Sequence, residues 1–176
     1  MIQSEVFNLN VDLSPEQQEM ADKFSVQFLV DENGEDWYDS QRKFSPDTWK
    51  ISVLPDGRIS EISRDISMMF PLNCRVMEFA ELPTGISVSE PWYVDLKTID
   101  IYRNENEVAE LMRDELIKSV TERILPLQQA QEDGDAEENE VAELMALRSY
   151  RTALRRLDIT TAPSIDWPDK PFSVEK

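Results

Sequence analysis

The 176 residues carry 36 acidic and 18 basic side chains, and the resulting net charge of −18 argues against nucleic acid as a partner, because phosphate binding needs clustered basic residues. An apolar fraction of 40% with four tryptophans excludes wholesale disorder, and no apolar run approaches the roughly 18 to 20 residues of a membrane span. The first residues lack the basic region and apolar core of a signal peptide, and there is one cysteine, so we expect a protein that remains in a reducing cytoplasm.

Short alternating apolar segments separated by turn signals fill the first hundred residues. Strands are expected at Phe24–Val30, Trp49–Val53, Ile59–Ile62, Arg75–Phe79 and within Trp92–Tyr102. Asn33-Gly34 is a hairpin signal after the first strand, and Pro55-Asp56-Gly57 turns the second strand back into the third. The pattern predicts a small, mainly antiparallel β domain over residues 1–103.

Helical periodicity replaces this alternation after Asn104. Asn104, followed three residues later by Glu107, has the form of an N-cap with its capping-box partner. Apolar residues then recur at helical spacing as far as Pro126, which should end or kink the first helix. A second helix is expected from about Ala136 to Leu157, so residues 104–158 are predicted to form a helical hairpin.

One heptapeptide occurs twice in this helical part, because residues 106–112 and 139–145 share the sequence Asn-Glu-Val-Ala-Glu-Leu-Met. Two helices with the same apolar face can pair antiparallel as a hairpin, or pair with the same helices of a second chain and form a homodimer. The alternative is that both segments simply use good helix formers. The candidate self-association residues are Val108, Leu111, Met112, Val141, Leu144 and Met145.

The last residues, 159–176, contain three prolines around Trp167. Proline cannot continue a helix and biases the preceding residue toward extended geometry, so an extended tail is expected here. The tryptophan favours a tail that lies along another part of the protein or along a partner.

Residues suited to catalysis are scarce. The absence of histidine excludes a Ser-His or Cys-His nucleophile and a histidine metal site. Cys74 falls in an alternating strand, where a buried structural role is more common than reactivity. Acidic pairs such as Asp31/Glu32 and Asp56/Glu61 are unavoidable among 36 carboxylates, and no glycine-rich phosphate loop is present. We therefore expect no enzyme and no catalytic, cofactor-binding or metal-binding residues.

The segment from Asp36 to Trp49 is rich in aromatic side chains and hydrogen-bonding groups. Tryptophan, tyrosine and arginine are the residues that most often anchor interfaces, which favours a binding role for some of this segment. The alternative is that its rings fill the core of the small β domain. The candidate partner-binding residues are Trp37, Tyr38, Phe44 and Trp49, with Trp167 as a second patch.

Both ends of the chain resemble one known family, the bacteriophage tail fibre assembly proteins. The N-terminal motifs, in order, are Asn33-Gly34, Trp37-Tyr38, Gln41, Phe44, Pro46-Asp47-Thr48 and Asp56-Gly57. The C-terminal motifs are Leu154 with Leu157-Asp158, Thr161-Ala162-Pro163 and Trp167-Pro168 followed by Pro171. One departure is Leu147, where related chains often have a tryptophan, so no role is carried over to that position.

The resemblance implies a chaperone that binds the C-terminal, receptor-binding end of a phage tail fibre and promotes its folding and trimerisation. It would work in the host cytoplasm by binding, without nucleotide hydrolysis, and some members remain attached to the fibre. A second interpretation is a structural virion component that stays at the fibre tip and binds host surface glycan through the same aromatic residues. A third is a dimerising regulator built on the repeated heptapeptide.

Overall fold

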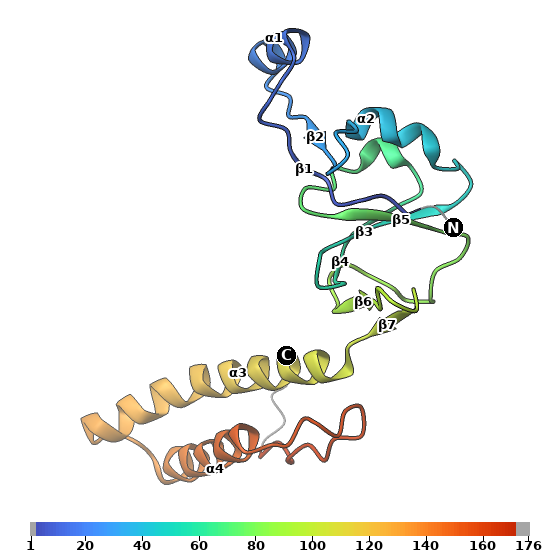
Figure 1. Ribbon diagram of the computed structural model, residues 1–176. Coiled ribbons are helices and arrows are strands. Elements are labelled where there is room, and N and C mark those ends of the chain that lie inside the picture. The colour runs from blue at the N-terminus through green and yellow to red at the C-terminus, as the bar shows by residue number, and fades with distance from the viewer. Residues whose placement is uncertain (1–2, 172–176) are drawn as a thin grey trace. The chain divides into compact units, whose positions relative to one another are not determined.

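The computed structural model describes residues 3–171 and divides into two compact units, with the division between Asn104 and Glu105 (Figure 1). The seven strands formed by the described residues all lie in the first unit, and the two longest helices lie in the second. The predicted α+β class, with antiparallel sheets followed by a helical hairpin, is confirmed.

A three-stranded antiparallel sheet forms the centre of the first unit. Strand β3 (Trp49–Val53) lies between β4 (Ile59–Ser63) and β5 (Arg75–Phe79). Ile51 at the middle of β3 is opposite Ile62 on one side and Met77 on the other. The three strands lie where the sequence predicts them, and the hairpin between β3 and β4 turns at the expected glycine.

Successive side chains of a strand point to opposite faces, and in this sheet each face packs against its own cluster of buried residues. One face contributes Val76 to a cluster with residues from helix α2 (Trp37–Ser40) and from the segment around the 3₁₀ helix η2 (Ile66–Met68). The other face contributes Ile51 to a cluster with the small sheet of β6 (Trp92–Val94) and β7 (Ile101–Arg103). The central strand β3 is consequently buried on both sides.

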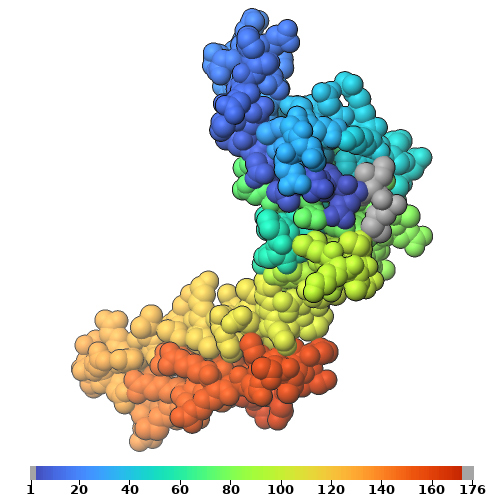
Figure 2. All heavy atoms as spheres, viewed as in Figure 1, coloured from blue at the N-terminus to red at the C-terminus, as the bar shows by residue number. Residues whose placement is uncertain are grey.

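The segment 24–30 differs from its prediction as a strand. Helix α1 (Pro15–Phe24) occupies its first residue, and only β2 (Leu29–Val30) is extended, paired with β1 (Asn8–Leu9). A capping box explains the helix, because the Ser14 hydroxyl accepts from the Gln17 N–H while the Gln17 side chain accepts from the Ser14 N–H. None of the residues of α1 is buried, and its atoms form a knob in Figure 2.

The turn between β3 and β4 brings the backbone of Gly57 against β6. The Gly57 carbonyl accepts a hydrogen bond from the Val94 N–H at 2.8 Å, and Gly57 has a φ of 93°. A Cβ atom at this position would lie 2.5 Å from the Val94 carbonyl oxygen, whereas a Cβ at Gly34 would meet nothing within 4 Å.

We expect Gly57→Ala to destabilise the first unit more than Gly34→Ala. Both glycines have positive φ, so both variants share the backbone strain, and only Gly57→Ala adds the collision with β6. The expected difference in free energy of unfolding is about 1 to 3 kcal/mol. Urea unfolding followed by tryptophan fluorescence measures it, and equal losses would contradict the close approach.

The second unit is a hairpin of α3 (Glu105–Asp133) and α4 (Glu138–Arg155). Pro126 was predicted to end or kink the first helix, and the first of these alternatives is wrong, because α3 continues for seven more residues. Ile124 and Leu127 flank the proline and are both buried in the core shared with α4, so packing compensates for the hydrogen bond that proline cannot donate.

The core of the hairpin is formed by Val120, Ile124, Leu127, Leu144, Leu147, Tyr150 and Leu154. Trp167 packs against this core from the tail, which makes turns between Thr160 and Ser164 before reaching it. The predicted tail is therefore only partly extended, and its last residues, 172–176, lie outside the described residues. No helix among the described residues is both long and apolar enough to cross a membrane.

Candidate functional site

The aromatic segment that precedes β3 folds into two short helical turns. The Asp36 carboxylate accepts from the Tyr38 N–H at 2.8 Å and caps α2, which the 3₁₀ helix η1 (Gln41–Lys43) follows directly. A helical turn of this kind sends Trp37 and Ser40 inward and leaves Tyr38 on the outer side.

Trp37 and Phe44 belong to the core, which is the alternative that the sequence left open for them. The Trp37 ring is fully buried, lies edge-on to Phe7 at 5.0 Å and donates its indole N–H to the Met69 carbonyl at 3.0 Å. The Phe44 ring is also buried, 6.3 Å from that of Trp37. These two rings support the segment from beneath and offer little surface to a partner.

The other three candidate aromatic residues are accessible. Tyr38 is 47% exposed and touches Phe28 edge to face. Trp49 is half-buried, with the Arg64 guanidinium 4.7 Å from the centre of its ring. Trp167 is half-buried in the second unit. A partner-binding role stays a prediction for these residues.

Two buried charged side chains hold the loop between Phe44 and Trp49. Lys50 is 1% exposed, and its ammonium donates to the carbonyl oxygens of Ser45, Thr48 (3.1 Å) and Arg64 (2.9 Å). Three carbonyl acceptors match the three N–H donors of an ammonium group. A buried lysine thus fixes the backbone of this loop from below.

Glu78 is the cross-strand neighbour of Lys50 on β5, and its carboxylate accepts hydrogen bonds from donors of the same loop. One of its carboxylate oxygens accepts from the Ser45 N–H and from the Thr48 hydroxyl, each at 2.6 Å. The Lys50 ammonium therefore binds the carbonyl oxygens of the loop, and the Glu78 carboxylate binds its hydrogen-bond donors. Pro46 and Asp47, in the middle of the loop, face solvent. The sequence contains a signal for this pair, namely a lysine within a strand that is otherwise mainly apolar.

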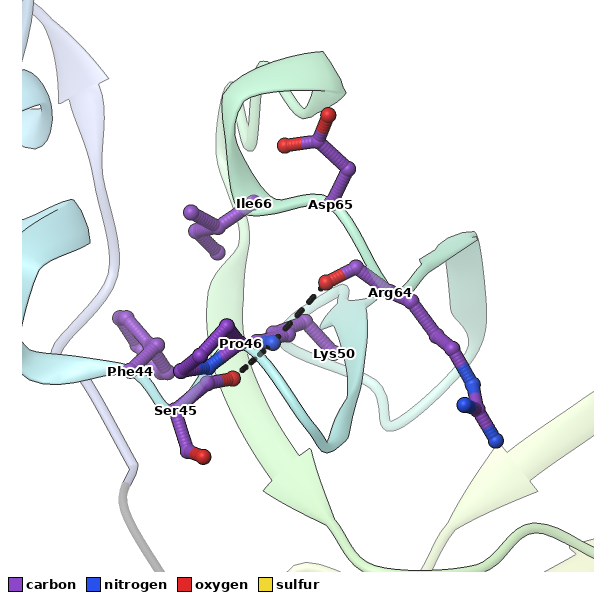
Figure 3. Close-up of a pocket in the computed structure, with 7 residues that line it drawn as sticks. All are labelled: Phe44, Ser45, Pro46, Lys50, Arg64, Asp65 and Ile66. Carbon is purple, nitrogen blue, oxygen red and sulfur yellow. Dashed lines mark hydrogen bonds between the residues drawn. The ribbon is translucent and has the colours of Figure 1, made fainter.

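A pocket of about 320 Å³ lies beside this loop. Figure 3 shows it lined by Phe44, Ser45, Pro46, Lys50, Arg64, Asp65 and Ile66, with dashed lines from Lys50 to the Ser45 and Arg64 carbonyls. The Arg64 side chain extends away from the other lining residues (Figure 3). Its guanidinium lies over the half-buried Trp49 ring, which is not among the residues that line the pocket.

The residues considered for catalysis have structural roles. Burial raises the pKa of the Cys74 thiol, which disfavours the reactive thiolate. Asp31 accepts from two N–H groups in the turn at Gly34, and Asp56 accepts from the Arg58 N–H in the turn at Gly57. Within residues 3–171, no three His, Cys, Asp or Glu side chains gather in a way that could hold a metal ion.

The two copies of the heptapeptide do not pack on one another within the hairpin. The second copy contributes Leu144 to the core, whereas the core takes its α3 residues from Leu116 onward, after the first copy. The two helices do pair antiparallel as a hairpin, which was one of the alternatives, but the pairing uses other residues of α3 and does not place one copy against the other. Leu111, Met112 and Met145 are exposed and Val108 and Val141 are half-buried, so pairing with a second chain stays a prediction.

Residues 39–172, from α2 to the tail, match the family described as "Caudovirales tail fibre assembly protein, lambda gpK". The chain belongs to the phage tail fibre assembly protein family. The resemblance noted from the two sets of motifs is thereby confirmed, and the matched region includes Lys50, Glu78 and Trp167. Helix α1 and Trp37-Tyr38 precede the matched region.

Relatives in the family cover most of the chain. A probable tail fiber assembly protein of Escherichia phage P2 is 26% identical over 162 residues, which are 89% of this chain and 91% of the relative. Tail fiber assembly protein U of Escherichia phage Mu is 27% identical over the same shares of each chain. A probable tail fiber assembly protein of Acyrthosiphon pisum secondary endosymbiont phage 1 is 33% identical over 79% of this chain and 92% of the relative.

Proposed function

We propose that this protein is an assembly chaperone that binds the C-terminal, receptor-binding end of a phage tail fibre and promotes its folding and trimerisation. It acts by binding, without nucleotide hydrolysis, in the host cytoplasm while virions assemble. The observation that carries the proposal is the family match, which extends over residues 39–172 and so includes parts of both units.

The accessible aromatic surface of the first unit supports this role. Trp49 presents ring surface directly after the loop that Lys50 and Glu78 fix, and Tyr38 presents ring surface on α2, which Asp36 caps. A rigid support reduces the entropy that is lost when such side chains bind a partner. We assign the first fibre contact to Tyr38 and Trp49, with Trp167 of the second unit as a separate contact.

Fibre chains that have not yet formed the trimer need a protein that covers their exposed surface. An intertwined trimer is rich in contacts between distant parts of the sequence, so it folds slowly and exposes strand edges and apolar surface meanwhile. A protein that covers this surface suppresses aggregation, and a net charge of −18 keeps the complex soluble.

Co-expression tests the proposal. The C-terminal region of the tail fibre encoded with this gene is expressed with and without the protein, and SDS-resistant trimer is measured by gel electrophoresis. We expect trimer only when the protein is present, and co-purification shows whether it remains bound. Equal amounts of trimer in both conditions would refute the chaperone role for that fibre.

A matched pair of tyrosines tests the assigned contact. Tyr38 and Tyr102 are both 47% exposed, and both lie in the first unit. We expect Tyr38→Ala to lower the yield of fibre trimer by roughly tenfold, the loss of one interface anchor, and Tyr102→Ala to leave the yield unchanged. Equal yields from the two variants would remove Tyr38 from the contact surface.

A further inference from the structure

Strand β4 ends the three-stranded sheet, and its outer side has no strand partner among the described residues beyond the bridge of Arg58 with Tyr93 just before it. The opposite edge, on β5, is covered by the chain's own N-terminal segment. There the Ser4 N–H donates to the Val76 carbonyl and the Phe7 N–H donates to the Cys74 carbonyl, each at 2.9 Å. The sheet is thus closed at one edge and open at the other.

A groove follows the open edge. It is lined by Ser60, Glu61, Ile62 and Ser63 of β4, by Met68 and Met69, and by Ile86, Ser87 and Val88. Since successive strand residues point to opposite faces, a groove that touches four in a row runs along the backbone edge and not over one face. The backbone groups on the outer side of β4 therefore open into it.

The two walls of the groove stand on opposite faces of the sheet. Met69 belongs to the core cluster on the Val76 face, and Ile86 packs against the cluster on the Ile51 face. Both walls carry exposed apolar side chains beyond these buried residues, because Met68 is 77% exposed and Val88 is 49% exposed. The groove therefore has the backbone edge of β4 at its base and apolar side chains on each of its two sides.

We propose that the β4 edge binds one extended strand of the partner protein and adds it to the sheet as a fourth strand. A strand satisfies the open backbone groups of β4 and sends alternate side chains toward the two apolar walls. A bound helix satisfies its own backbone and would leave those of β4 unpaired. The segment that binds has apolar side chains on both faces and no proline at a position that must donate to β4.

This inference rests on the proposed function, because the strand donor is the tail fibre before its own strands have found their partners. Strands of an unfinished trimer have the open edges and apolar faces that the groove fits. Binding at β4 would shield one such strand until the other fibre chains displace the protein or assemble around it.

Lysine substitutions in the walls test the inference. The double variant Met68→Lys, Val88→Lys places charge on both apolar walls at exposed positions, where it should leave the fold intact. We expect the yield of SDS-resistant fibre trimer in co-expression to fall by roughly tenfold. The matched control is Val11→Lys, because Val11 is 79% exposed and lies outside the groove. Circular dichroism melting checks that all three proteins are equally stable.

The results separate the two proposals. If the unmodified protein yields no additional trimer, the chaperone role fails and the strand donor with it. If the unmodified protein and the double variant raise the yield equally, the chaperone role stands and the β4 inference is overturned. Hydrogen exchange during refolding of the fibre fragment is the direct measurement, with slowed exchange expected at Ser60–Ser63, and slowing confined to other segments would also overturn it.

Discussion

Replacing Trp37 with alanine should remove about 3 to 5 kcal/mol from the free energy of unfolding of the first unit. The ring is fully buried against Phe7 and Phe44, so its loss leaves a cavity in a small core. It also leaves the Met69 carbonyl without the indole donor that now lies 3.0 Å away. Urea unfolding monitored by circular dichroism measures the change.

The neighbouring Tyr38→Ala is the matched control, since Tyr38 lies one residue further along α2 and is 47% exposed. Its ring is half exposed and meets the Phe28 ring edge to face, so the loss of stability should stay below about 1 kcal/mol. The two variants should therefore separate stability from binding. A Trp37→Ala protein that unfolds like the unmodified one would contradict the placement of this ring in the core.

Replacing Lys50 with methionine should lower the free energy of unfolding of the first unit by about 3 kcal/mol or more. Two effects oppose one another here. Methionine fills a similar volume and removes the cost of burying a charge, but the part-buried carbonyl oxygens of Thr48 and Arg64 lose the donor that the ammonium now provides, and the Ser45 carbonyl keeps only the Thr48 hydroxyl. The second effect is larger, because each unsatisfied buried polar group costs about 1 to 3 kcal/mol.

The loop from Ser45 to Thr48 should also become less rigid in Lys50→Met, since only Glu78 and the hydrogen bonds within the loop would still hold it. The exposed Lys97→Met, in the same unit, is the control for loss of a positive charge and should change stability little. Unfolding in urea measures the stability, and co-expression with the fibre measures the function. Equal stability of the two variants would show that the Lys50 hydrogen bonds contribute nothing net.

The sequence determined the class of the fold because its signals are local. Alternation at Trp49–Val53, the turn at Gly57 and the return at Ile59 specify the central hairpin without reference to the rest of the chain. Helical spacing after Asn104 likewise specifies the hairpin of α3 and α4. The ordered motifs at both ends also identified the family, which the match over residues 39–172 confirmed.

Errors arose where two local signals competed. Residues 24–30 alternate like a strand, but the Ser14 capping box starts a helix whose last residue is Phe24. Pro126 is a helix breaker by itself, yet burial of Ile124 and Leu127 against α4 keeps α3 continuous. In each case the prediction used one signal alone, the alternation or the proline, whereas the fold also depends on the capping box or on the buried neighbours.

Only the tertiary structure decided which aromatic residues are accessible to a partner and which belong to the core. Trp37 and Tyr38 are adjacent and equally suited to an interface by type, but one is in the core and the other on the surface, because the sheet covers one side of α2. The pairing of Lys50 with Glu78 across β3 and β5 and the open edge of β4 depend on strand order. Strand order arises from pairing between segments that are distant in the sequence, and the residue pattern of one strand does not specify which strands lie beside it.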